Sequence, residues 1–126
     1  MHKSRLGGFI IDCQGADLDS AANFWASALG LQAKRNPDPW EQKYRALSGK
    51  TRDLHIEVQS VEHPSRVHLD IETDDIEAEV QRLEVLGATR VGMVHDWCVM
   101  QAPTGQRFCV VRAHSSSFDL EANSWD

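Results

Sequence analysis

The sequence predicts an α+β fold built from two βαβββ modules, and two observations lead to this prediction. The segment from Asp17 to Gly30 is repeated 57 residues later by the segment from Asp74 to Gly87. Each segment begins with an aspartate that can cap a helix and ends in Leu-Gly. Each also follows a strand-like stretch and is followed by enough residues for three more strands. We therefore expect a curved, mostly antiparallel sheet with the helices on its convex side.

The first module is expected to span about residues 6–60. Its first strand covers residues 6–13, and the polar residues 1–5 before it are predicted to be frayed. Asp17 then begins a helix whose apolar residues recur at helical spacing. These residues are Leu18, Ala21, Ala22, Trp25, Ala28 and Leu29. Three further strands are expected at 31–35, 40–47 and 54–59.

The second module, about residues 66–113, begins with a strand of alternating side chains. Val67, Leu69 and Ile71 are expected to face a core, which leaves His68 and Asp70 on the opposite face. A small-molecule site needs polar groups that are not packed in the core. We therefore expect the site on this opposite face of the strand.

A helix should follow, with Asp74 as its N-cap, Leu83 in its apolar stripe and Gly87 as its stop. Strands are then expected at 89–94, 97–100 and 107–112, with a hairpin turn at 103–105. The remaining residues, 114–126, form a polar tail with three scattered apolar residues, and the whole chain is predicted to be one domain.

Composition limits the partners that this chain can have. A net charge of −6 disfavours nucleic acid and anionic membranes, which both attract basic surfaces. The apolar run near the N-terminus is too short for a signal peptide or a membrane span. Three cysteines without close-spaced pairs are typical of reduced thiols, so we expect a cytoplasmic protein.

Three motifs together resemble the vicinal oxygen chelate superfamily, which includes glyoxalases, bleomycin resistance proteins and extradiol dioxygenases. The motifs are His-Leu-Asp-Ile-Glu-Thr-Asp-Asp from His68, Leu-Gly-Ala-Thr from Leu86, and Pro-Thr-Gly-Gln-Arg-Phe-Cys from Pro103. The similarity is greatest to the small glyoxalase-like domain branch. It implies a small-molecule site on the concave face of the sheet and a homodimer, but not one reaction, because this fold hosts several chemistries.

The resemblance also implies four metal-ligand positions, and this chain keeps few of them. His68 matches the ligand position at the start of the second module, and Glu57 matches the one on the fourth strand. At the ligand position on the first strand this chain has Gly8, which cannot bind a metal; a register shift would place Ile10 or Asp12 there instead. At the ligand position on the eighth strand, Cys109 replaces the usual carboxylate. We therefore expect no tightly held cofactor and well under one divalent metal per chain; His68 and Glu57 would be the ligands if one binds.

Acid–base chemistry is the main alternative to metal chemistry for the same residues. Glu57 and His68 are the predicted catalytic groups, because a carboxylate in a half-apolar cavity can exchange protons near neutrality. Further residues could contact a substrate. These are His55, Asp70, Tyr44, Trp97 and Cys109, with Trp40 as a further aromatic wall.

Each of these residues also has a structural interpretation. The acidic residues could be solvated charges at the rim of the sheet, and His68 could be a hydrogen-bonded, partly buried histidine. The aromatic residues could belong to the core or to a dimer contact. Cys109 lies in a core-like strand, so packing is favoured over a nucleophile there.

The sequence leaves three functions open. The first is a glyoxalase-like lyase or isomerase acting on a small metabolite with adjacent oxygens. The second is a non-catalytic protein that binds an antibiotic or another small ligand, and the third is a scaffold with a vestigial pocket. In each case we predict a homodimer, with the apolar tail residues Phe118, Leu120 and Trp125 docked on this chain or on its partner.

Overall fold

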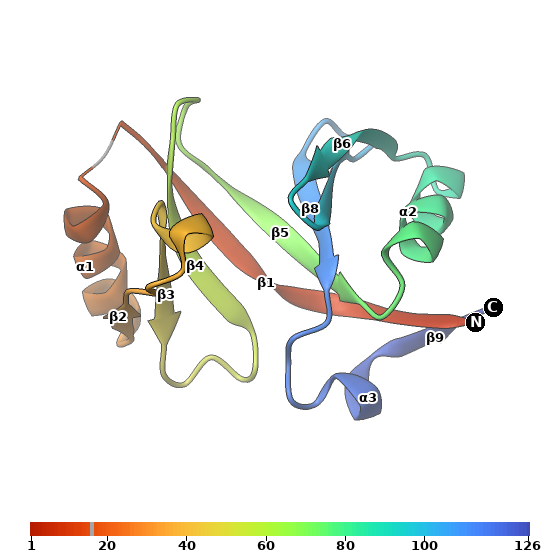
Figure 1. Ribbon diagram of the computed structural model, residues 1–126, viewed down its shortest axis with the longest axis horizontal. Coiled ribbons are helices and arrows are strands. Elements are labelled where there is room, and N and C mark those ends of the chain that lie inside the picture. Colours follow the sequence, from red (N-terminus) through yellow and green to blue (C-terminus); the bar gives the residue numbers. More distant parts are fainter. Residues whose placement is uncertain (16) are drawn as a thin grey trace. The chain divides into compact units, whose positions relative to one another are not determined.

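The computed structural model describes residues 1–126 apart from Ala16 and the side chain of Trp40 (Figure 1). It confirms a mixed α+β fold with a large, open, mostly antiparallel sheet, and the described residues form three α-helices. The chain forms two compact units: one contains Met1–Gly8 and His68–Asp126, and the other contains Phe9–Val67. Strand β1, His2–Gln14, contributes to both units. The predicted single-domain boundaries stay a prediction.

The Phe9–Val67 unit contains the first predicted helix and three strands in addition to the end of β1. These elements are α1 (Leu18–Leu29), β2 (Gln32–Lys34), β3 (Tyr44–Ser48) and β4 (His55–Val61), with a short 3-10 helix, η1, at Pro39–Glu41. The strand order is β2-β3-β4-β1. Asp17 caps α1 as predicted, since its side chain accepts hydrogen bonds from the backbone of Asp19 and Ser20. Ala22 and Ala26 of α1 are buried with Leu47 and Val58 in one core.

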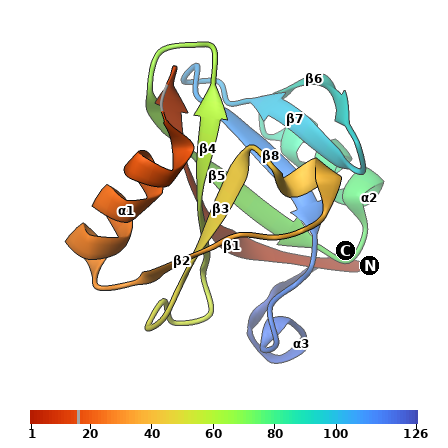
Figure 2. The same ribbon diagram turned by 60° about the vertical axis from the view of Figure 1, so that its left-hand side comes forward.

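The other unit repeats this arrangement. Its elements are β5 (Arg66–Thr73), α2 (Ile76–Val85), β6 (Thr89–Val94), β7 (Trp97–Gln101) and β8 (Arg107–Arg112), followed by α3 (Phe118–Glu121) and β9 (Asn123–Trp125). The strand order β5-β8-β7-β6 mirrors β1-β4-β3-β2, because the first strand of each module pairs with its fourth. Figure 2 shows these four strands side by side with α2 behind them. The core lies between α2 and the sheet, and its buried members are Val80, Leu83, Ala88, Cys98, Met100 and Val110.

The N-terminal residues are ordered, and the prediction that residues 1–5 are frayed is wrong. His2 and Ser4 are buried within β1, which pairs with β9 so that His2 lies opposite Trp125. The His2 Nε2 lies 2.8 Å from Oε1 of Glu79, and the Trp125 indole donates to Oγ of Ser4 at 2.8 Å. These two polar side chains are therefore buried with polar partners from α2 and from the tail.

The tail thus docks on its own chain. Phe118 is buried, and the guanidinium of Arg82 lies 3.9 Å from the centroid of the Trp125 ring. Arg82 also forms two hydrogen bonds to the buried carboxylate of Glu79, at 2.9 and 2.8 Å. The tail and the N-terminus therefore stabilise each other through α2, whereas Leu120 remains exposed.

Three local predictions need correction. The N-cap of α2 is Asp75, which accepts from the backbone of Ala78, whereas Asp74 accepts a hydrogen bond from the backbone of Lys3 at 2.8 Å. The strand predicted at 40–47 begins only at Tyr44, because the preceding Pro-Asp-Pro segment leads into η1. Val67 and Leu69 are exposed, because the core under α2 lies against β7, β8 and the later part of β5.

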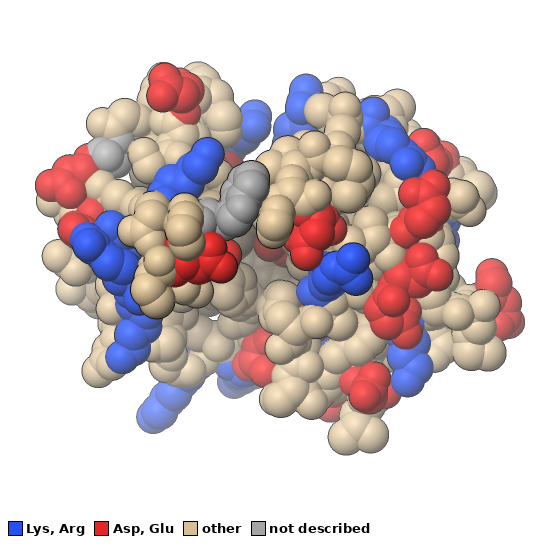
Figure 3. All heavy atoms as spheres, viewed as in Figure 1, with Lys and Arg blue, Asp and Glu red and all other residues tan. Residues whose placement is uncertain are grey.

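Charged side chains on α2 form surface ion pairs. Arg90 reaches Glu77 at 3.0 Å and Glu84 at 3.4 Å. In Figure 3, acidic atoms gather over the part of the surface that α2 forms, with basic atoms beside them. In the described chain, no helix is long and apolar enough to span a membrane.

Candidate functional site

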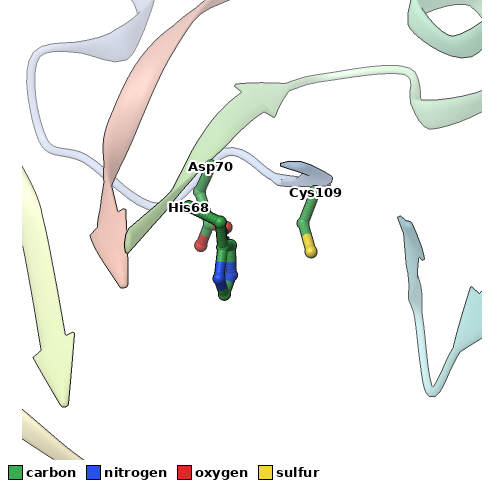
Figure 4. A group of neighbouring side chains, drawn as sticks. All are labelled: His68, Asp70 and Cys109. Atoms are coloured by element: carbon green, nitrogen blue, oxygen red, sulfur yellow. Dashed lines mark ion pairs between the residues drawn. The ribbon is translucent and has the colours of Figure 1, made fainter. Parts of the chain in front are cut away.

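Three of the predicted site residues lie together on one face of the sheet. His68 and Asp70 alternate along β5 with Ile71, which packs on the α2 core, so they point to the opposite face. Strand β8 runs parallel to β5 with Cys109 directly opposite Asp70, so the Cys109 side chain lies on that same face. Figure 4 shows the three side chains projecting from the two strands in the same direction.

The geometry of this His68–Asp70–Cys109 cluster is compact. Nε2 of His68 lies 3.7 Å from Oδ1 of Asp70, and one nitrogen, oxygen or sulfur atom from each residue lies within 4.8 Å of the others. The side chains of His68 and Asp70 are 14% and 11% exposed, and Cys109 is 9% exposed. An imidazole, a carboxylate and a thiol thus meet where water is largely excluded, which strengthens their interactions with one another and with a ligand.

Trp97 lies on the same face of this unit. Cys98 of β7 faces the α2 core and pairs with Val110, so the flanking side chains of Trp97 and Val99 point the other way, and Val99 pairs with Cys109. The Trp97 ring packs edge to face against His95 with their centroids 6.0 Å apart. This position agrees with the predicted role of Trp97 as an aromatic wall, which stays a prediction.

Glu72 continues the same row of β5 and has a structural role. Its side chain is fully buried and accepts hydrogen bonds from Nε of Arg5 at 2.8 Å, from the backbone of His114 at 2.9 Å and from Ser115. A Cβ at Gly7 would lie 3.0 Å from Cβ of Glu72, so glycine permits this close approach of β1 to β5. The hydrogen bonds to the Glu72 carboxylate thus come from other residues of the chain, and they hold the fold together.

The remaining predicted residues form a second group in the Phe9–Val67 unit. Val58 of β4 packs under α1, so His55 and Glu57 point to the other face, where they form a hydrogen bond between His55 Nε2 and Glu57 Oε1. Ala46 pairs with Glu57 across β3, which places Tyr44 on the same face. The Tyr44 hydroxyl accepts a hydrogen bond from the side chain of Gln59 at 3.1 Å. Glu57 is therefore held in a fixed orientation, with its side chain 13% exposed.

Glu41 belongs to this second group and was not predicted. Burial raises the pKa of the Glu41 carboxyl, and the negative charge of Glu57 raises it further, while His55 acts in the opposite direction. Sequence reasoning missed it because residues 40–47 were assigned to a strand. The Pro-Asp-Pro turn before Trp40 was the available signal for a helical turn. The side chain of Trp40 lies outside the described part of the chain.

The structure therefore gives one group of candidate residues in each unit. His68, Asp70, Cys109 and Trp97 belong to one unit, and His55, Glu57 and Tyr44 belong to the other. The prediction that His68 and Glu57 line one cavity stays a prediction.

Comparison with known families supports the resemblance found in the sequence. Residues 8–111 match the family model described as "Glyoxalase-like domain". The chain belongs to this family. No curated protein shows significant sequence similarity to the chain.

Solved structures show the same fold at low sequence identity. A hypothetical protein from Bacillus halodurans superposes with a TM-score of 0.64 at 13% identity, covering 88% of this chain and 95% of that one. Methylmalonyl-CoA epimerase from Streptomyces coelicolor, bound to 2-nitronate-propionyl-CoA, gives a TM-score of 0.56 at 15% identity, covering 89% and 97%. A glyoxalase/bleomycin resistance protein/dioxygenase superfamily member from Vibrio splendidus gives 0.51 at 21% identity, covering 85% and 98%. At these identities the likeness establishes the fold alone.

Proposed function

We propose that this glyoxalase-like protein is a small-molecule enzyme with lyase, isomerase or related activity. The observation that carries the proposal is the convergence of His68, Asp70 and Cys109 on the sheet face opposite α2. An imidazole and a thiol, which can donate hydrogen bonds, meet there with a carboxylate, which can accept them, and the group is largely shielded from water. Such a concentration of reactive groups at the surface of a sheet is typical of a ligand site.

The proposed substrate is a small carbonyl compound or thioester with an acidic C–H bond beside the carbonyl. The imidazole of His68 and the thiol of Cys109 can donate hydrogen bonds to the carbonyl oxygen, whereas the Asp70 carboxylate can only accept, from the imidazole or from a substrate hydroxyl. In the other unit, Glu57 is held by His55 and is a further carboxylate that we propose for acid–base chemistry, which its own variant tests separately. The structurally similar methylmalonyl-CoA epimerases support testing this class, since one is bound to 2-nitronate-propionyl-CoA and another to methylmalonyl-CoA.

Isotope exchange tests the proposal without knowledge of the final product. A panel of small 2-oxo acids, 2-hydroxy ketones and acyl-CoA thioesters is incubated with the protein in D2O, and deuterium uptake beside the carbonyl is measured by mass spectrometry. We expect uptake with at least one class, and a loss of about 100-fold or more in His68→Gln and in Glu57→Gln. His63→Gln and Glu62→Gln, in the turn between β4 and β5, are the matched controls. Uptake that the first two variants leave unchanged would contradict the assigned roles.

A non-catalytic binder is the second candidate, and the replacement of a carboxylate by Cys109 favours it. In that case, flat organic ligands should raise the melting temperature without any deuterium uptake. His68→Gln should then reduce the shift in melting temperature, and His63→Gln should not.

We also propose that the protein is a homodimer. The edge strand β6 carries the exposed apolar residues Val91, Met93 and Val94, and open sheet edges with such residues favour pairing. Light scattering at micromolar concentration should give about twice the 14.2 kDa mass of one chain. Because the tail docks on its own chain, replacing the exposed Leu120 by Ser should leave this mass unchanged. A mass near 14.2 kDa at high concentration would contradict the proposal.

A further inference from the structure

We infer that the sheet face carrying the His68–Asp70–Cys109 cluster selects a small 2-oxo acid with an apolar tail. The carboxylate of this ligand contacts Arg107, and its tail lies on an apolar shelf, defined as the side chains of Val94, Trp97, Val99 and Val111. The inference rests on the proposed function and narrows its substrate to one chemical class. The cluster, the shelf and Arg107 all belong to the same unit of the chain.

The apolar shelf lies on the same face of the sheet as the cluster. It is formed by β6, β7 and β8, which lie side by side in Figure 2. Val99 pairs with Cys109, and Val94 pairs with Trp97. Val111 follows Cys109 by two residues on β8, so it shares that face. The shelf therefore continues the surface of the cluster with apolar side chains, which are half-buried apart from the 43% exposed Val94.

Gly92 leaves the space over this shelf open. It pairs with Val99, so a side chain at this position would project over the shelf. Apart from its chain neighbours, no heavy atom lies within 4 Å of the place that its Cβ would occupy. At the other side, the ring of His95 packs edge to face on Trp97 and orients the indole. The shelf thus has an aromatic wall and space for an apolar tail of several carbon atoms.

The opposite end of β7 and β8 is polar. Arg107 precedes Cys109 by two residues and pairs with Gln101, so both polar side chains lie on the face of the cluster. The Arg107 Nε–H donates to Oε1 of Gln101 at 3.0 Å, which orients the guanidinium. A guanidinium has further N–H donors in a planar fork that binds a carboxylate through two parallel hydrogen bonds. An anionic group of a ligand is therefore expected at this end.

The order of these groups along β8 determines the class of the ligand. Arg107, Cys109 and Val111 stand at alternate positions of the strand, about 7 Å apart. A carboxylate at Arg107 would place the next carbonyl oxygen toward Cys109 and His68, and the rest of the molecule over Val111 and the shelf. In a 2-oxo acid the carboxylate is bonded directly to the carbonyl carbon, and the tail leaves from the other side. This order of charge, carbonyl and apolar tail matches the order of the side chains.

Calorimetric titration with straight-chain 2-oxo acids of four to eight carbon atoms measures the shelf without any turnover. The dissociation constant should fall about 15-fold from the shortest acid to the longest, because each half-covered CH2 group contributes about a factor of two. Gly92→Leu fills the open space and Trp97→Ala removes the wall, so each should reduce this gain to about threefold or less. Both variants should bind the shortest acid within about twofold of the wild type. Met93→Leu is the matched control, because Met93 follows Gly92 but pairs with Cys98 on the α2 side.

Arg107→Gln tests the polar end by the same titrations. It should weaken the binding of every acid in the series about fivefold and leave the dependence on tail length unchanged. Uncharged 2-ketones with the same tails should bind the variant and the wild type equally. Arg112→Gln is the matched control, since Arg112 lies on the same strand, faces the α2 side with Val110 and pairs with Asp96 at 3.3 Å.

Ligand binding and deuterium uptake separate this inference from the proposed function. The inference would be overturned by a dissociation constant that does not depend on tail length, by a dependence that Gly92→Leu and Trp97→Ala both leave unchanged, or by the absence of binding at millimolar concentration for the whole series. Tail-dependent binding without deuterium uptake would support the inference and reject the enzyme. Deuterium uptake that depends on His68 but not on tail length would support the enzyme and reject the inference.

Discussion

Leu83→Asp should leave the chain unfolded. Leu83 is buried on α2 against β7 and β8, in the core with Val80, Met100 and Val110. The substitution removes apolar contacts and places a carboxylate where no polar partner is available from these neighbours. Burying an unpaired charge costs several kcal/mol, against a typical total stability of about 5–15 kcal/mol. Circular dichroism and urea titration at neutral pH should show loss of the cooperative unfolding transition.

Val85→Asp is the matched control, since it makes a similar change two residues later on the same helix. Val85 is 88% exposed, so its replacement by a charged residue should change the free energy of unfolding by about 0.5 kcal/mol or less. If Leu83→Asp unfolds with the same urea midpoint as Val85→Asp, then α2 does not bury its apolar stripe as the structure shows.

The topology could be predicted from the sequence because it depends on local patterns that occur twice. A capping aspartate, an apolar stripe and a Leu-Gly ending are all readable within a short segment, and their repetition implied two similar modules. The structure confirms this through the matching strand orders β1-β4-β3-β2 and β5-β8-β7-β6. Leu83 was assigned to the core for the same reason.

The terminal segments could not be predicted in this way. His2 and Ser4 are polar, so nothing nearby in the sequence indicates a buried strand. Their partners, Glu79 and Trp125, lie far away in the sequence and are brought near by the folding of α2 and β9. A buried polar side chain is stable only when it has hydrogen-bond partners, and these can lie anywhere in the sequence. The residue type at one position therefore does not indicate whether that residue is buried.

The candidate site was predicted only in part. The alternation along β5 was sufficient to place His68 and Asp70 on one face. The approach of Cys109 depends on the register of the parallel β5–β8 pair, which connects segments separated by a helix and two strands. Glu41 was missed because its position depends on the turn at η1 rather than on any repeating pattern.

Glu72→Gln should produce the second large loss of stability. The carboxylate is fully buried and is held by Arg5, by Ser115 and by the backbone amide of His114. A glutamine keeps the shape but removes the charge, and its NH2 group would face other donors. Removing one partner of a buried ion pair costs about 3–5 kcal/mol, and the slight exposure of Arg5 favours the lower end. Glu121→Gln, an exposed change in the tail, should cost about 0.5 kcal/mol or less.

The pH dependence of this loss identifies the charge as its cause. Burial by itself would raise the pKa of Glu72, but hydrogen bonds from Ser115, Arg5 and the backbone of His114 outweigh burial and hold that pKa below its usual value. A carboxyl group with a depressed pKa contributes stability that is fully present above its unfolded pKa of about 4.3 and is lost as the pH falls through the folded value. The difference in unfolding free energy between the wild type and Glu72→Gln should therefore shrink as the pH falls below about 4.3. Urea titrations across this acidic range measure the difference directly, and a gap that does not shrink there would show that Glu72 stabilises the fold through its shape rather than its charge.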